Sequence, residues 1–222
     1  MAIEVRKAGD RFRTDDGGRT TEHSFSFGTH YDPANVGFGL LVAHNDEHLP
    51  PGTGYAAHPH RDLEIVTVVL SGALRHTSEA GSGVLGPGGV QRLSAGSGVV
   101  HAEVADDPAI ETRFVQTWLP PTTPGTTPSY ARRDGVTGTG LVPLAGGDAD
   151  LGLGVSAALL RGVADGVLVL PDAARMHLFV VTGAFDVGGH ALGAGDAVRL
   201  SDEGGREVGG TGELLVWVSD GR

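Results

Sequence analysis

Two short motifs carry the side chains of this sequence that are best suited to chemistry. They are His58-Pro59-His60 and His101-Ala102-Glu103. In each motif two metal-binding side chains lie two residues apart, so on a β-strand both would point to the same face of the sheet. Two such strands that met inside one fold would bring together three imidazoles and one carboxylate. This ligand set suits Fe, Mn, Ni, Cu or Zn, whereas Ca²⁺ and Mg²⁺ prefer oxygen ligands.

The residues around both motifs predict strands that could position them. In the second motif, Val99, His101 and Glu103 alternate with other residues and would share one face. From residue 58 the chain reads HPHRDLEIVTVVL up to Leu70, which we interpret as one strand that is apolar on both faces and lies between two layers, and Ser71-Gly72 then ends it. Its even positions would share the face of the first two histidines: His58, His60, Asp62, Glu64, Val66, Val68 and Leu70.

The composition predicts an all-β protein. Gly accounts for 37 of the 222 residues, and Gly clusters separate short apolar runs along the whole chain. Long stretches with apolar residues at helical spacing are missing, so we expect many short strands joined by turns, in a sandwich or barrel. The absence of cysteine excludes disulfides, thiolate metal sites and a cysteine nucleophile.

Charge and hydropathy restrict the partners that we expect. The formal net charge is −11, which argues against direct binding to nucleic acid, because such binding needs a basic surface. No stretch approaches the roughly 20 apolar residues of a transmembrane helix. No apolar signal segment follows Met1. We therefore expect a soluble, cytoplasmic protein.

An internal repeat indicates two similar β-domains. Residues 68–74 resemble residues 179–185, and residues 86–93 resemble residues 193–200 in the same order. Between the two copies, the Pro- and Thr-rich segment 120–128 cannot pair in a central strand and is typical of an extended linker.

The repeat also tests the metal hypothesis. The second-copy positions that correspond to the four candidate ligands are Val169, Pro171, Val208 and Gly210, and none of these binds a metal well. The framework is therefore repeated without its ligands, which favours a chemical role in the first copy alone. We interpret the other histidines without such a role: His23 as packed or hydrogen-bonded, His44 and His48 as solvated, and His177 and His190 as structural or exposed.

The motifs and their surroundings resemble the pirins, a bicupin family. The resemblance rests on HPHRDLE, on SAGSGVVHAE and on the opening FRTDDGGRTTEHSFSFGTHYDPANVGFG; it is strong in the N-terminal half and weak over residues 135–222. It implies two jelly-roll, cupin β-sandwich domains in one chain that face each other. We expect a metal-binding domain at residues 1–119, a linker at 120–134 and a C-terminal domain without ligands at 135–222.

The resemblance implies a metal ligand set by motif position. Pirins hold one metal, usually iron, through three histidines and a glutamate, which here are His58, His60, His101 and Glu103. Glu64 takes the place of the carboxylate ligand of other cupins, but the spacing of Glu103 to His101 mirrors the His58–His60 pair and favours Glu103. We expect one divalent transition metal, Fe(II) first, with Mn, Ni, Co, Cu or Zn as alternatives.

Two functions follow from the resemblance. Similarity to some bacterial pirins implies quercetin 2,3-dioxygenase activity, in which a flavonol reacts with O₂, its central ring opens and carbon monoxide leaves. Glu103 would then accept the hydroxyl proton, with Glu64 as second candidate, and Val66, Val68 and Val99 would line the pocket. Other pirins imply a non-catalytic, iron-dependent redox sensor that binds a transcription factor or a metabolic enzyme. A monomer is expected, because a bicupin supplies its second domain internally.

Overall fold

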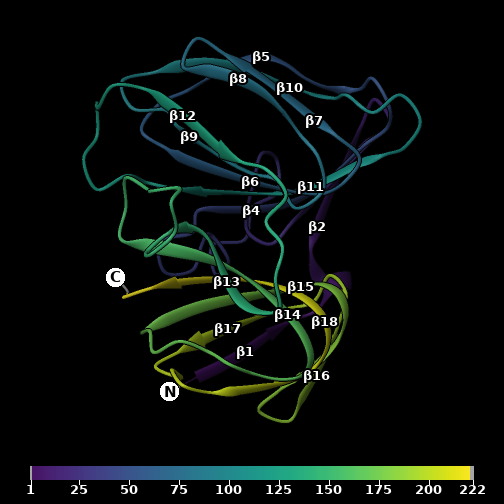
Figure 1. Cartoon of the computed structure of the whole chain (residues 1–222), viewed down its shortest axis with the longest axis vertical. Helices are drawn as coiled ribbons and strands as arrows, with labels where there is room; N and C mark the ends of the chain where they lie inside the picture. Colours follow the sequence, from purple (N-terminus) through teal and green to yellow (C-terminus); the bar gives the residue numbers. More distant parts are fainter. Residues whose placement is uncertain (1, 221–222) are drawn as a thin grey trace.

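The computed structural model describes residues 2–220, which form two β-structured halves, one above the other in Figure 1. The predicted all-β class is confirmed, because the elements of this part of the chain are strands apart from the short 3₁₀ helix η1 (Ala8–Asp10). No helix among the described residues is long and apolar enough to cross a membrane. The sheets are open at their edges and do not close into barrels.

The upper half is a sandwich of two antiparallel sheets. Its strands are β2 (Phe12–Asp16), β3 (Arg19–His23), β4 (Ala43–Leu49), β5 (Gly54–His60), β6 (Glu64–Ser71), β7 (Leu74–Ser78), β8 (Gly81–Leu85), β9 (Val90–Ser94), β10 (Val99–Ala105), β11 (Thr112–Leu119) and β12 (Ser129–Arg133). One sheet has the order β5-β10-β7-β8 and the other the order β12-β9-β6-β11-β4-β3-β2. One end of the space between them is filled by apolar side chains, among them Leu49, Val69, Leu74 and Phe114.

The lower half is a single curved sheet. Its strands are β1 (Ala2–Arg6), β13 (Gly140–Gly146), β14 (Ala157–Val169), β15 (Arg175–Val187), β16 (His190–Gly193), β17 (Ala197–Ser201) and β18 (Glu207–Ser219). The order is β1-β17-β15-β18-β14-β13, with β16 paired to β15. Three of these strands are 13 residues long, and they curve around an apolar core that includes Leu178, Phe185, Val208 and Leu214.

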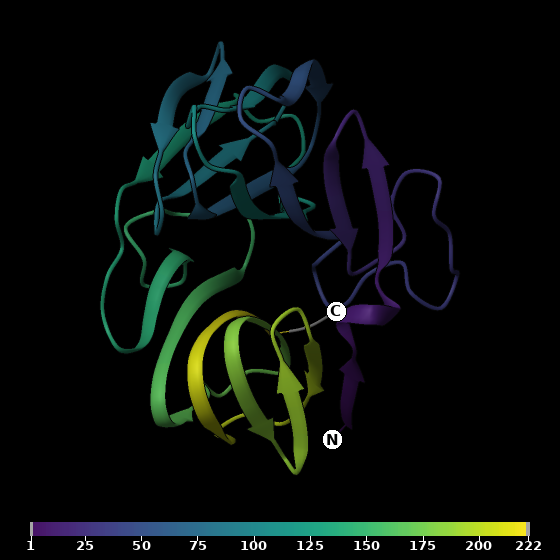
Figure 2. The same cartoon turned by 90° about the vertical axis from the view of Figure 1, so that its right-hand side faces the viewer.

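Sheet membership differs from the predicted domain boundaries at two places. Strand β1 pairs with β17, so residues 2–6 complete the lower sheet before the chain enters the upper half, as Figure 2 shows. Strand β12 pairs with β9, so the second part of the expected linker is an edge strand of the upper half. The Pro-rich part, residues 120–128, has no strand. Proline lacks the N–H that a strand ladder needs, whereas Ser129–Arg133 contains no proline.

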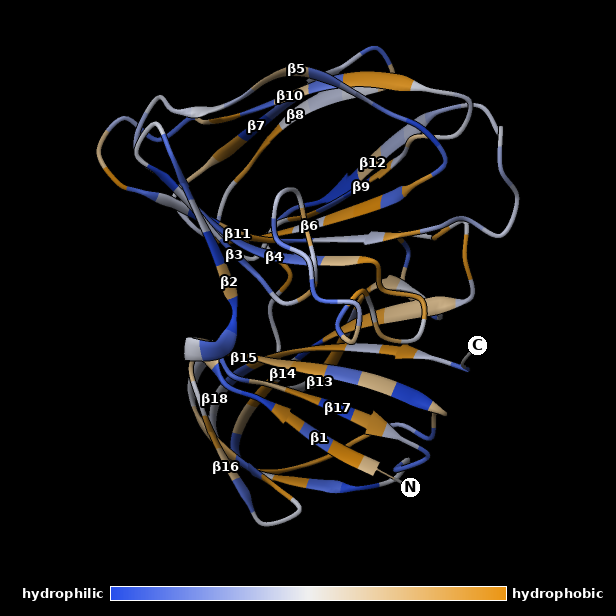
Figure 3. Cartoon of the chain, turned by 180° about the vertical axis from the view of Figure 1, so that it is seen from behind, coloured by the Kyte–Doolittle hydropathy of each residue, from blue (hydrophilic) through white to orange (hydrophobic). Residues whose placement is uncertain are grey.

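The two halves share one apolar core. Val66 and Val68 on β6 belong to the same buried cluster as Leu144, Phe179 and Trp217 of the lower half. The indole Nε1 of Trp217 also donates a hydrogen bond to Thr117 Oγ1 on β11, at 3.1 Å. Figure 3 shows apolar residues in strands of both halves. The seven-stranded upper sheet is therefore buried on the face that meets the lower half as well as on its inner face.

The expected single strand over residues 58–70 is wrong. Strand β5 ends at His60 and β6 begins at Glu64, and the two lie in opposite sheets. Between them Asp62 adopts a left-handed conformation with φ 51°. Its N–H donates to Gly96 O at 2.9 Å, and its Oδ1 accepts from Gly125 N at 2.6 Å. These bonds hold the chain in the turn that carries it from one sheet to the other.

This turn also inverts the predicted faces of β6. Residues Ile65 and Val69 pack inside the upper sandwich, whereas Val66 and Val68 face the lower half. The alternation restarts after the turn, because β6 lies in the sheet opposite β5 and its odd positions face the interior. The even positions after residue 62 therefore do not share a face with the two histidines.

Candidate metal centre

Three histidines meet between the two upper sheets. His58 and His60 lie on β5, and His101 lies on β10, directly opposite His58 in the antiparallel ladder. Their rings are close, with centroids 4.4–4.9 Å apart, and one ring nitrogen of each lies within 4.8 Å of the others. The two-residue spacing on β5 and the pairing with β10 produce this convergence.

The hydrogen bonds of His58 determine its tautomer. Its Nδ1 lies 2.8 Å from the carbonyl oxygen of Ala56, which can only accept, so Nδ1 carries the proton. The lone pair is then on Nε2, which lies 3.0 Å from Nε2 of His101. The Nε2 atom of His60 is buried and has no hydrogen-bond partner among residues 2–220. Buried polar atoms usually have a hydrogen-bond partner, so an unpartnered ring nitrogen is consistent with a metal ligand.

The charge state of the cluster also suits a cation. Burial, together with the neighbouring His58, lowers the pKa of His60 to about 4. Burial and the three nearby histidines lower the pKa of His101 to about 3. Both rings are therefore neutral at pH 7, and neutral imidazole is the form that binds transition metals. The residues present fit a divalent transition metal.

Glu103 joins this cluster through His101. It lies two residues further along β10, past a register shift, and forms a second compact group with His101 and His76. Its carboxylate accepts hydrogen bonds from Gln91 Nε2 at 3.1 Å and Gln116 Nε2 at 2.8 Å. Burial raises the pKa of Glu103 to about 7, against the effect of the Gln116 bond. The carboxyl group is thus poised to exchange a proton near neutral pH.

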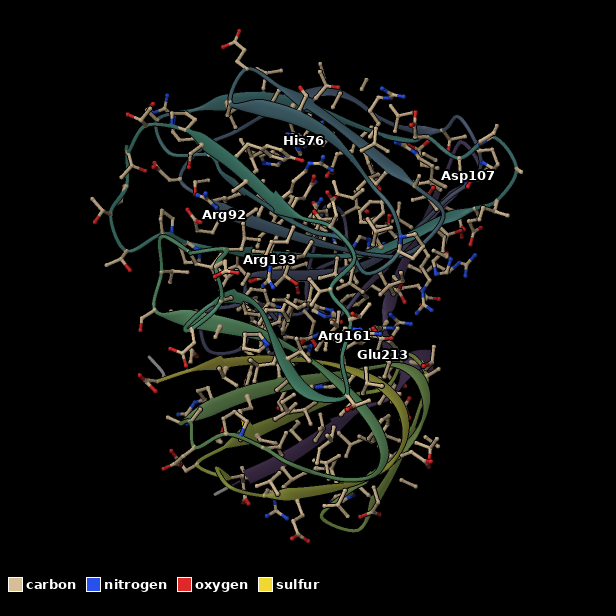
Figure 4. The ribbon with its side chains drawn as sticks, in the orientation of Figure 1. His76, Arg92, Asp107, Arg133, Arg161 and Glu213 are labelled. Atoms are coloured by element: carbon tan, nitrogen blue, oxygen red, sulfur yellow. The ribbon has the colours of Figure 1, made fainter. Side chains whose placement is uncertain are left out.

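His76 was not foreseen from the sequence. It lies on β7 inside the upper half (Figure 4), with its Nδ1 3.4 Å from Nδ1 of His101 and its ring stacked on Tyr130. Burial lowers the pKa of His76 to about 4. The sequence does contain a signal for its burial: His76 lies two residues after Leu74, so both side chains lie on the buried face of β7. His76 can orient the ring of His101, as partners of metal-binding histidines do.

A pocket of about 380 Å³ opens beside the histidines. Its inner wall comes from β5, β10 and β11, and its outer wall comes from the β2–β3 hairpin and residues 27–29. The residues that line it are Thr14, Asp16, Arg19, Thr21, His23, Phe27, Gly28, Thr29, Asn45, Glu47, Tyr55, His58, His60, Glu103, Gln116 and Trp118. Its volume falls within the range of small-molecule sites, roughly 300–1,000 Å³.

Comparison with known proteins places this site in a family. A family model described as Pirin matches residues 5–119, just over half of the chain. The chain belongs to the pirin family. The match covers β2 to β11, which supply every candidate metal ligand.

Relatives match most of the chain. A protein of Mycobacterium tuberculosis, provisionally named a quercetin 2,3-dioxygenase, is 44% identical over 229 residues, covering 97% of this chain and 94% of its own. A pirin-like protein of Caulobacter vibrioides is 35% identical over 201 residues, covering 85% and 86% of the two chains. An Escherichia coli protein named quercetin 2,3-dioxygenase is 38% identical over 143 residues, covering 63% and 62%.

Solved structures confirm the pirin bicupin fold. YhhW from Escherichia coli superposes with a TM-score of 0.92 at 28% identity, covering 98% of this chain and 97% of its own. Bacterial pirin YhhW in complex with nickel(II) superposes with a TM-score of 0.88 at 30% identity, covering 98% and 99%. The metal-bound relative and the His/Glu cluster together indicate a transition-metal site in this chain.

Four residues expected beside the metal ligands lie elsewhere. Val66 and Val68 pack in the core between the halves. Glu64 also faces the lower half, next to Gly154, and accepts a hydrogen bond from Ser94 Oγ at 2.8 Å. Val99 packs in the apolar cluster of β6 and β9 and is not among the residues that line the pocket. For the first three the reason is the turn at Asp62, which inverts the faces of β6.

The polar stretch at residues 44–48 contains Glu47, a further carboxylate that lines the pocket. It forms β4 within the seven-stranded sheet, and His44, expected to be solvated, is fully buried. Asn45 and Glu47 line the pocket, while His44 faces the lower half. A strand with polar residues on both faces lacks the apolar alternation that identifies strands, which is why the sequence pattern suggested a solvated segment.

Glu47 is held in one orientation by two hydroxyl groups. Its Oε2 accepts hydrogen bonds from Thr21 Oγ1 at 2.6 Å and from Tyr55 OH at 2.7 Å. Burial raises the pKa of Glu47. His23, expected to be packed or hydrogen-bonded, lies nearby and bonds through Nδ1 to Asn45 Oδ1 at 3.0 Å. The pocket therefore offers oriented polar groups opposite the histidine cluster.

Proposed function

We propose that this protein is a metal-dependent dioxygenase that opens the ring of a flavonol such as quercetin. The observation that carries the proposal is the junction of the buried histidine cluster with a pocket large enough for a small aromatic molecule. The names of its relatives support the same activity. We further propose His58, His60, His101 and Glu103 as metal ligands and Fe(II) as the metal, with Mn, Ni, Co, Cu or Zn as alternatives.

The metal would supply Lewis acidity and the redox chemistry that a reaction with O₂ requires. The protein supplies the base: Glu103, with a pKa of about 7, can accept the proton of a flavonol hydroxyl. Gln91 and Gln116 hold the carboxyl group in position through their amide bonds. A bound cation would lower the pKa of Glu103 and keep more of it ionised at neutral pH.

The pocket can orient a flat substrate. Phe27 and Trp118 meet edge to face, with centroids 5.1 Å apart, and offer an aromatic wall beside the histidines. Trp118 Nε1 donates to Gln116 Oε1 at 2.9 Å, which links this wall to the amide that holds Glu103. Polar groups such as Glu47 and Asn45 could recognise the hydroxyl groups of a polyphenol.

The test is flavonol turnover with defined metals. The purified protein is loaded with Fe, Mn, Ni, Co or Cu, and loss of the near-UV/visible band of quercetin is followed with and without a chelator. We expect chelator-sensitive turnover with at least one metal. Absence of turnover by every form would overturn the dioxygenase and leave a non-catalytic metal-binding protein.

Variants separate the metal ligands from the base. His58→Ala should lower metal content at least tenfold and remove activity, whereas His190→Ala, at an exposed histidine on β16, should change neither. Glu103→Gln removes a proposed ligand as well as the base, so its kcat is compared per bound metal, and on that basis it should fall by roughly 100-fold or more. Full metal content in His58→Ala would contradict its assignment as a ligand.

A further inference from the structure

A second, smaller cavity lies where the two halves meet, away from the metal centre. Its volume is about 20 Å³. His177 on β15 and Arg199 on β17 line it from the lower half, while Arg11 after η1, Ser24 and Asn35 line it from the segment that enters the upper half. None of these residues lines the pocket beside the histidine cluster.

Several residues that line the cavity have buried polar atoms without hydrogen-bond partners among residues 2–220. The guanidinium Nε atoms of Arg6, Arg11 and Arg199, which all line it, are buried and have no hydrogen-bond partner among residues 2–220. Both ring nitrogens of His177 are also unpartnered within the described chain. Arg199 is 3% exposed and His177 is 1% exposed. Buried donors without acceptors are costly, so this arrangement points to a ligand that accepts hydrogen bonds.

The charge of Arg199 is poorly compensated by the protein. Its Nη2 donates to two neutral oxygens, Asn35 Oδ1 at 2.6 Å and Ser24 O at 3.1 Å. The carboxylate recorded near it is that of Glu4, 3.6 Å from Nη1, which is also the ion-pair partner of Arg6. Burial lowers the pKa of Arg199 only to about 10, so the group is charged at pH 7.

The other cations around the cavity have their own carboxylates. Arg11 pairs with Glu22 and Asp46, and Lys7 pairs with Asp196 at 2.8 Å. Asp10 lines the cavity from its exposed side. Arg199 is therefore the cation with the weakest compensation at the cavity, because the carboxylate beside it is shared with Arg6, and a poorly compensated buried charge is destabilising.

We propose that this cavity binds one halide-sized inorganic anion, with chloride as the physiological candidate. A cavity of about 20 Å³ exceeds the roughly 10–15 Å³ that one water molecule needs, so it can hold a single small ion such as chloride. Three of the unpartnered atoms are guanidinium nitrogens, which can only donate, and the neutral ring of His177 adds one further donor, so donors outnumber acceptors and favour an anion. The ligand would join Arg199 of the lower half to Arg11 at the entry of the upper half. The proposal does not depend on the proposed activity.

Anomalous diffraction tests the site directly. Crystals of the unmodified protein are soaked in bromide, and an anomalous difference map is computed. We expect a peak in contact with Arg11, His177 and Arg199. Bromide peaks confined to the surface, or a water molecule in the cavity under saturating bromide, would overturn the proposal.

Thermal stability tests the site in solution. Tm is compared in sodium chloride and sodium gluconate at equal ionic strength, for the metal-loaded protein. At chloride concentrations ten times Kd, the unmodified protein should gain roughly 3–6 °C. Arg199→Met should lose this gain, because it removes the cation with which the anion would pair.

A matched variant controls for loss of any buried arginine. Arg161→Met removes a part-buried arginine of the same sheet, which forms a two-point ion pair with Glu213 at 2.8 Å (Figure 4). It should keep the chloride-dependent gain in Tm. An equal gain in Arg199→Met, or no gain in the unmodified protein, would contradict the proposal. If Arg199→Met does not fold, the bromide experiment decides on the unmodified protein.

Discussion

His44 and His177 form a buried pair where β4 meets β15. Their rings lie edge to face with centroids 4.8 Å apart, and both are 1% exposed or less. Burial lowers the pKa of His44 to about 4, with Asp46 opposing and Arg11 and Arg199 adding to the effect. Burial, His44 and Arg199 lower the pKa of His177 well below its usual value. Both rings are neutral in the folded protein.

This pair predicts a loss of stability in mild acid. In the unfolded chain both histidines bind protons below about pH 6.5, whereas in the folded chain they do not. The stabilisation is therefore complete above pH 6.5 and is lost as the pH falls towards the folded pKa of His44, about 4. Each histidine contributes a slope of about 1.4 kcal/mol per pH unit in this window.

His177→Gln should reduce this slope by about 1.4 kcal/mol per pH unit, which is the contribution of one histidine. The free energy of unfolding is measured by urea denaturation between pH 7.5 and pH 5 in a buffer without halide. His190→Gln, at an exposed position on β16, is the control and should leave the slope unchanged. Identical slopes in both variants would show that His177 does not stay neutral in the folded protein.

At the scale of elements, glycines allow the long strands of the lower sheet to bend. In β15 the register with β18 shifts between Val180 and Thr182, and Gly183 follows with φ +82°. A Cβ atom at Gly183 would clash with the carbonyl oxygen of Thr211 on β18. This close approach of two backbones, combined with a positive φ, is a position that glycine alone fits well.

Gly183→Ala should therefore be strongly destabilising. Strain at positive φ and the clash together should lower the free energy of unfolding by roughly 2–4 kcal/mol. Gly209→Ala on the neighbouring strand β18 is the control, since a Cβ there meets no atom within 4 Å. Chemical denaturation of both variants measures the difference. Equal losses of stability would mean that the bend of β15 does not depend on glycine.

At the scale of the whole molecule, the two halves depend on each other. The cluster that contains Val66, Phe179 and Trp217 is built from both, and Trp217 bonds to Thr117 across the junction. Strand β1 pairs in the lower sheet, and the chain then enters the upper half. Separation of the halves would expose this shared apolar core to water, which is unfavourable at about 25 cal/mol per Å².

Unfolding should therefore be a single cooperative transition. Each half contains one tryptophan, Trp118 or Trp217, so fluorescence reports on both. We expect coincident transitions by fluorescence and circular dichroism, and equal calorimetric and van't Hoff enthalpies. Two resolved transitions in calorimetry would show that the halves unfold independently and that the shared core contributes little.

Local patterns were sufficient to predict the fold class and the histidine motifs. Strand periodicity, turn glycines and ligand spacing are properties of neighbouring residues, so they can be read without knowledge of the tertiary structure. The same residues, HPHRDLE and SAGSGVVHAE, indicated the pirin family. Glu103 was preferred over Glu64 from its spacing to His101 and from the pirin resemblance, and Glu64 lies on the face of β6 that meets the lower half.

Only the tertiary structure decided which residues surround the cluster. The turn at the left-handed residue Asp62 sends β5 and β6 to opposite sheets, and the faces that periodicity assigned to β6 are inverted. Glu47 on β4 and His76 on β7 reach the site through the pairing and stacking of the sheets, and the cavity at Arg199 needs both halves. These features depend on contacts between residues far apart in the chain, and such contacts leave no local period in the sequence.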